Sequence, residues 1–135
     1  MQATTVYDLR YPSAEEAIIG MILHRPELIA ELKKIKDFGP ADFFTEFNRR
    51  VYEYIISKTE ESEGVFDEGW LSEAFNEGEM GRIVKMKIRR MELSNNSAET
   101  LRECVMRLKE ASSVKNVVDI QDLEELIKNK RRKNQ

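Results

Sequence analysis

The sequence predicts an all-α fold, a helical bundle followed by a short C-terminal helical hairpin. Apolar residues recur at intervals of three and four through most of the chain, as on the buried face of a helix. Cap and stop residues punctuate these periodic stretches. No stretch alternates convincingly between apolar and polar residues; residues 114–120 could be taken for a strand, but a lone strand has nothing to pair with.

The length and composition fit one soluble domain without metal or disulfide support. A chain of 135 residues buries roughly two thirds of its unfolded surface. We expect an extended lead-in at 1–12, a bundle at 13–111 and a hairpin at 112–135. The single cysteine cannot form an internal disulfide and suggests a reducing cytosol. No signal peptide and no apolar run of the ~20 residues that span a bilayer are found.

Two helices are predicted before residue 40. Ser13 opens the first, and Glu16 completes a capping-box pattern with it. Pro26 suits the first turn of the second helix, and Gly39-Pro40 ends it. Ile19 and Leu23 widen the apolar stripe of the first helix, which should be largely buried. The main stripes of the two helices consist of Ala14, Ala17, Ile18, Met21 and Ile22, and of Leu28, Leu32 and Ile35.

The stretch from residue 43 to residue 57 is predicted to be the central helix of the bundle. Thr45 can cap it by accepting from a backbone N–H of the first turn. Its apolar residues fall on two faces, which requires neighbours on several sides. The positions left for solvent are Asn48, Arg49, Glu53 and Lys58.

An acidic segment over 59–79 separates this helix from a basic one. Asp67 is expected to cap a short helix, and Asn76 with Glu79 to begin the next as a capping box. That helix, 80–93, is predicted to turn five apolar side chains inward. They are Met80, Ile83, Val84, Ile88 and Met91.

The helix from residue 98 carries the clearest amphipathic pattern. We expect Asn96 and Glu99 to form its capping box. Ser112-Ser113 weakens the helix, and Asp119 can cap a last one. Its apolar stripe consists of Leu101, Cys104, Val105, Leu108 and Ala111.

The residues predict no catalytic site, no metal site and no cofactor. His24 has no second histidine or nearby cysteine to share a metal with, so a structural role is expected. Cys104 lies on an apolar stripe, which indicates a buried, inert thiol. The acidic run lacks the alternating ligands and central glycine of a calcium loop, and phosphate-loop and metalloprotease motifs are absent.

The basic helix leaves three roles open. Its cations can form ion pairs with the acidic segment, contact a protein partner or bind nucleic acid. Salt-sensitive phosphate binding would use Arg82, Lys85, Arg89 and Arg90. No aromatic residues are interleaved with them for base stacking, so ion pairing within the fold is favoured and no direct nucleic-acid contact is expected.

The C-terminal hairpin is the predicted partner-binding site. Its apolar residues are too many for so small a unit to bury by itself, so it docks on the bundle or offers surface to another protein. They are Val114, Val117, Val118, Ile120, Leu123, Leu126 and Ile127.

Three segments carry a resemblance to a known family. SAEEAIIGMILHRPELI (13–29), DFFTEFNRRVYEYI (42–55) and EMGRIVKMKIRRMELSNNSAETLRECVMRLKE (79–110) resemble the C-terminal helicase-binding domain of bacterial DnaG-type primases. The N-terminal domain of the replicative helicase is related in fold and shares the opening pattern AEExxxGxxxxxPExI. That helicase domain is therefore the alternative identification.

The primase resemblance implies a non-catalytic, cytoplasmic module of the primosome. It would dock primase, the parent enzyme, on the N-terminal domains of the hexameric replicative helicase during DNA replication. The hairpin would make the main contact, which extends the predicted partner-binding residues from Val114 to Arg131. Neither a membrane nor a cofactor is implied.

Overall fold

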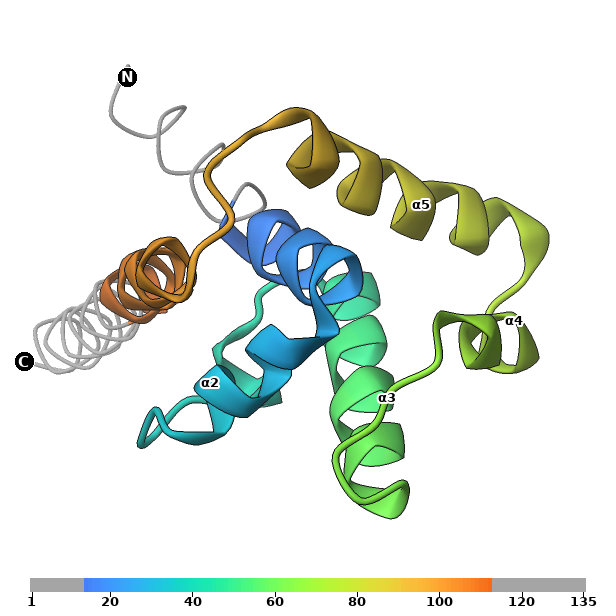
Figure 1. Ribbon diagram of the computed structural model, residues 1–135, viewed down its shortest axis with the longest axis horizontal. Helices are drawn as coiled ribbons and strands as arrows, with labels where there is room; N and C mark the ends of the chain where they lie inside the picture. The colour runs from blue at the N-terminus through green and yellow to red at the C-terminus, as the bar shows by residue number, and fades with distance from the viewer. Residues whose placement is uncertain (1–13, 113–135) are drawn as a thin grey trace, which may run out of the picture.

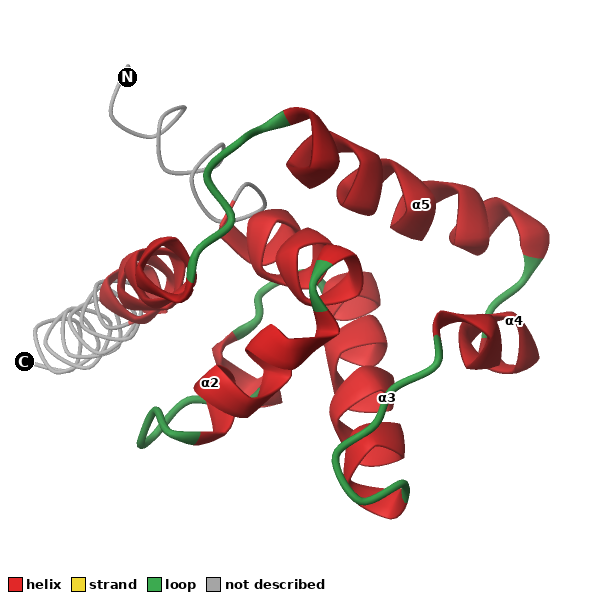
Figure 2. Cartoon of the chain, viewed as in Figure 1, coloured by secondary structure: helices red, strands yellow, loops and turns green. Residues whose placement is uncertain are grey.

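The computed structural model describes residues 14–112, and this part of the chain is entirely helical, with loops between the helices (Figures 1 and 2). The prediction of an all-α fold is confirmed. The lead-in and nearly all of the predicted hairpin lie outside the described residues. Helical stretches at 14–24 and 98–112 flank η1 (Pro26–Leu28), α2 (Ile29–Lys33), η2 (Pro40–Asp42), α3 (Glu46–Glu61), η3 (Glu68–Trp70), α4 (Leu71–Ala74) and α5 (Glu77–Glu92).

The 14–24 helix, not α3, lies at the centre of the bundle. The other long helices surround it in Figure 1. Ile18, Ile19, Met21 and Ile22 are all fully buried, although they point in several directions around the helix. A short helix that is apolar nearly all round can only be stable with neighbours on every side.

Gly20 lets α5 cross the 14–24 helix at close range. A Cβ atom at this position would lie 2.3 Å from the backbone oxygen of Met86 and 2.7 Å from Cγ of Arg90. Only glycine leaves room for the α5 backbone there. The crossing fixes α5 against one side of the central helix.

Thr45 precedes the first residue of α3, but the side chain that caps α3 comes from another helix. The Thr45 side chain makes no capping bond, so that prediction is wrong. The buried Glu15 carboxylate accepts from the backbone N–H of Phe44 at 2.5 Å and from Nδ2 of Asn48 at 2.9 Å. Asn48 is therefore buried, not solvated as predicted. A carboxylate suits this position because the helix dipole favours negative charge at an N-terminus.

Two other predicted caps are confirmed. Asp67 accepts from the backbone N–H of Gly69 at 2.8 Å. Asn76 and Glu79 form the reciprocal capping box that begins α5, with bonds of 2.9 and 3.0 Å. These signals are local, so the sequence contains all the information they need.

The predicted cap of the 98–112 helix is wrong by one residue. Ser97 accepts from the N–H of Thr100, and Asn96 instead ends α5. Nδ2 of Asn96 donates to the carbonyls of Arg90 and Leu93, both at 2.7 Å. A side chain thus supplies donors to carbonyl groups at the end of α5.

The 98–112 helix packs as predicted. Leu101, Val105 and Leu108 are essentially fully buried, and Cys104 and Ala111 are nearly so. Its outer face carries charged residues and one exposed methionine, Met106.

Candidate protein-docking surface

Helix α5 presents a row of apolar side chains to solvent. Ile83 and Met86 face the central helix and are buried. Val84, Ile88 and Met91 are 41%, 45% and 53% exposed, so the prediction that they point inward is wrong. Their spacing of four and three residues places them on one face, which we call the α5 outer row. Half-buried Met80 continues the row by one turn.

The outer row is exposed because α5 lies at the edge of the bundle (Figure 1). The central helix covers only the strip around the Gly20 crossing. The short α4 and its neighbour η3 lie beside the beginning of α5, and the Glu68 side chain of η3 reaches further along it to Lys87. Apolar periodicity predicts which face of a helix is buried, but it does not predict how much of that face a neighbouring element covers.

Several cations of α5 are engaged within the fold. Lys87 pairs with Glu68 at 2.9 Å, and Arg82 lies 4.0 Å above the ring of Phe47. Arg90 donates through Nε to Oδ1 of Asn96 at 2.9 Å. These contacts agree with the predicted intramolecular role of the basic helix.

Lys85 and Arg89 remain without an ion pair among the described residues. With Arg82 and Glu16 they line a small hollow of about 100 Å³ beside the central helix. The spacing of 82, 85 and 89 places the cations on a face away from the outer row. Two isolated cations beside a carboxylate make a weak phosphate site.

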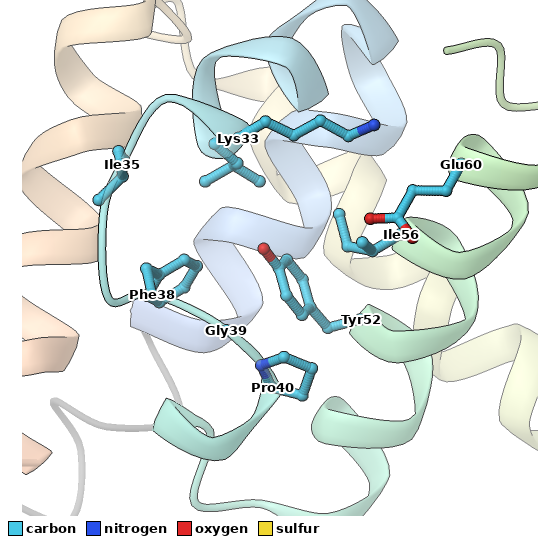
Figure 3. A pocket seen from close by; sticks show the side chains of 9 residues that line it. Lys33, Ile35, Phe38, Gly39, Pro40, Tyr52, Ile56 and Glu60 are labelled. Atoms are coloured by element: carbon cyan, nitrogen blue, oxygen red, sulfur yellow. The ribbon is translucent and has the colours of Figure 1, made fainter. Parts of the chain in front are cut away.

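A second concave feature lies on the opposite side of the central helix. Residues of α2, the 34–40 loop and α3 enclose a cavity of about 450 Å³, with the ring of Tyr52 at its wall (Figure 3). Sequence reasoning missed this cavity. The one feature of the sequence that pointed to it was Gly39-Pro40. These two residues end one amphipathic helix and require a loop before the next.

Cys104 and His24 are the two residues that the sequence offered for a chemical role. Cys104 is buried, and burial raises the pKa of its thiol, which disfavours the reactive thiolate. His24 lies half-buried at the end of the central helix. Within residues 14–112 no cluster of acidic, histidine and cysteine residues could hold a metal ion, and no helix there is long and apolar enough to cross a membrane.

The predicted hairpin contact residues cannot be placed on this surface. Val114, Val117, Val118, Ile120, Leu123, Ile127 and Arg131 all lie outside the described residues. Their role stays a prediction.

The described residues form an all-helical domain with an exposed apolar helix face and a cavity. Residues 8–120 match the family of DnaB-like helicase N-terminal domains, and the chain belongs to that family. No curated protein and no solved structure matches the chain.

The family match corrects the identification as a primase module. The chain belongs with the helicase domain that shares the opening pattern at residues 14–29, which was the alternative. The primase and primosome assignments, and primase as parent enzyme, have no support. Two domains related in fold share the same buried positions, so apolar segments alone did not separate them. The family domain is non-catalytic, as expected for this chain.

Proposed function

We propose that this chain is the protein-docking and assembly domain of a DnaB-like replicative helicase. The observation that carries the proposal is the family match over residues 8–120. The domain performs no chemistry and contributes binding surfaces. Its partners are other copies of the same domain in the helicase ring and the primase.

The α5 outer row supports this role. Val84, Ile88 and Met91 form an apolar strip along one side of a long helix, and contiguous exposed apolar surface marks interaction sites. An amphipathic helix of a partner can lie along such a strip with its own apolar face. The capping box and the Gly20 crossing hold α5 rigidly, so little ordering is needed on binding.

The two identifications predict different partners. A primase module binds the intact helicase and has no reason to bind primase. A helicase domain binds primase directly. We therefore propose sedimentation of the chain mixed separately with primase and with the helicase ring from the same source.

We expect the chain to co-sediment with primase at micromolar concentrations. Assembled rings already contain this domain, so they should take up little added chain. Uptake by the ring together with no association with primase would contradict the proposal.

A further inference from the structure

The cavity beside Tyr52 has the size of a binding pocket, and the side chains that line it do not fill it. It measures about 450 Å³, within the range of small ligand sites. Ile35 and Phe38 form one side of it, and Tyr52 and Ile56 of α3 form the other (Figure 3). Leu32 of α2 also lines it. The lining therefore combines apolar side chains with polar groups, among them the Tyr52 hydroxyl, Lys33 and Glu60.

The Tyr52 hydroxyl is the polar group that points into this cavity (Figure 3). Tyr52 is only 3% exposed, and its ring stacks on Phe43 at 4.6 Å and meets the edge of Phe38 at 5.7 Å. Within the described residues the hydroxyl has no hydrogen-bond partner. Burial, with a smaller effect of Asp42, raises its pKa, so it remains a donor at neutral pH. The hydroxyl lies at the cavity wall, where it is free to donate to a group that enters the cavity.

The rim carries one charge of each sign. Lys33 of α2 and Glu60 of α3 line the mouth, and both are exposed. No ion pair is formed by either residue within residues 14–112. Each can pair with an opposite charge on a bound polypeptide.

We propose that this cavity receives one apolar anchor side chain of a partner protein. The anchor fills the space between α2 and α3, and the backbone carbonyl beside it accepts from the Tyr52 hydroxyl. An acidic and a basic residue flanking the anchor pair with Lys33 and Glu60. A side chain fitted into a pocket is the usual form of a binding hot spot.

The inference rests on the proposed docking function but concerns a different surface. The cavity is lined from α2, the 34–40 loop and α3, whereas the outer row belongs to α5, and α2 and α5 lie on opposite sides of the central helix (Figure 1). Each can therefore be altered without touching the other.

The test is a methyl-resolved NMR titration of the full chain with N-acetyl-leucine-N′-methylamide, a leucine side chain between two backbone amides. We expect saturable shifts of the Ile35 and Ile56 methyl signals, with an affinity of about 1–10 mM for so small a probe. Tyr52→Phe keeps the ring and removes the donor, so the affinity should fall roughly 3- to 10-fold.

Tyr54→Phe is the matched control. Tyr54 lies on the same helix, and its hydroxyl donates to the Trp70 carbonyl at 2.7 Å, outside the cavity. This variant should bind the probe as the native chain does. Ile56→Trp, which fills the cavity from a half-exposed position, should abolish binding.

Three results would overturn the inference. They are the absence of saturable shifts, equal affinity of native chain and Tyr52→Phe, and binding that appears only after removal of residues 1–12. The last would make the chain's own first residues the occupant. If the probe fails while the native chain still associates with primase, the pocket inference fails and the proposed function stands.

Discussion

Glu15 shows how a single buried charge can organise a helix junction. Its carboxylate is fully buried and joins the central helix to the beginning of α3 through Phe44 and Asn48. A buried carboxylate is tolerated only when donors surround it, and three residues supply them here, since Thr45 also donates at 3.4 Å. The residue therefore specifies how two helices meet.

Glu15→Gln should lower the free energy of unfolding by about 2–3 kcal/mol. The amide brings an NH₂ group against backbone and side-chain donors and removes a charge-assisted bond. Urea denaturation measures the loss. Glu53→Gln, an exposed change on α3, should stay within about 0.5 kcal/mol of the native chain, and an equal loss in both variants would contradict this role of Glu15.

Gly20 and Gly81 should respond to alanine with opposite signs. A Cβ at Gly20 meets the Met86 carbonyl, so Gly20→Ala should destabilise the fold by about 1–3 kcal/mol. A Cβ at Gly81, on α5, meets nothing within 4 Å, so Gly81→Ala should stabilise it by about 0.5–1 kcal/mol. Thermal unfolding of both variants measures the two changes in stability. An unchanged stability of Gly20→Ala would mean that the two helices do not cross so closely.

Cys104 should be unreactive in the folded chain. Burial raises its pKa, so the thiol stays protonated at a pH where an exposed cysteine is partly ionised. The unfolded chain then loses this proton first, and stability falls as the pH rises through the unfolded pKa of about 8.5. Ellman's reagent at pH 8 should react far more slowly without urea than with it; equal rates would place the thiol at the surface.

At the scale of elements, the connection between α5 and the 98–112 helix depends on Asn96. Its side chain ends α5, and its backbone carbonyl accepts from Nη1 of Arg25 at 2.9 Å. One residue thus joins α5, the last described helix and the loop after the central helix.

Asn96→Ala should destabilise the fold by about 2–3 kcal/mol, because the carbonyls of Arg90 and Leu93 lose their amide donor and Nε of Arg90 loses its acceptor. Asn95→Ala is the neighbouring control at an exposed position. It removes the exposed bond that Oδ1 of Asn95 accepts from the Thr100 hydroxyl but retains the Asn95 carbonyl bonded to Arg90, so it should cost less. Chemical denaturation compares the two. A greater cost at residue 95 would show that the cap is assigned to the wrong asparagine.

What the sequence could predict at this scale depended on distance along the chain. The caps at Asp67 and at Asn76 with Glu79 use partners two or three residues away, and both were predicted. Glu15 caps a helix about thirty residues later, and no local pattern contains that contact. The buried residues of the 98–112 helix were predicted correctly, because one whole face of that helix is covered by the bundle. On α5 too many residues were predicted to be buried, because this helix is covered only along a narrow crossing.

The candidate surfaces were less predictable than the fold. The outer row consists of residues that periodicity assigned to the core, and the Tyr52 cavity depends on how a loop closes over α3. Both are set by which elements become neighbours. The cationic residues of α5 were recognised, but their partners Glu68 and Phe47 lie on other elements.

At the scale of the whole molecule, the domain combines a tightly held centre with two separate outward surfaces. The central helix is buried on all sides, so α2 and α3 on one side and α5 on the other are each free to present residues outward. Such a body suits an assembly domain, which must contact more than one partner without changing shape.

Calorimetric titration of primase into this chain and into an Ile88→Glu, Met91→Glu double variant tests the central claim most directly. We predict micromolar binding by the native chain and a loss of tenfold or more in the double variant, because the charges interrupt the α5 outer row. Met106→Glu, at the 62% exposed methionine of another helix, should bind as the native chain does. Native-like binding by a folded double variant would show that α5 is not the docking surface.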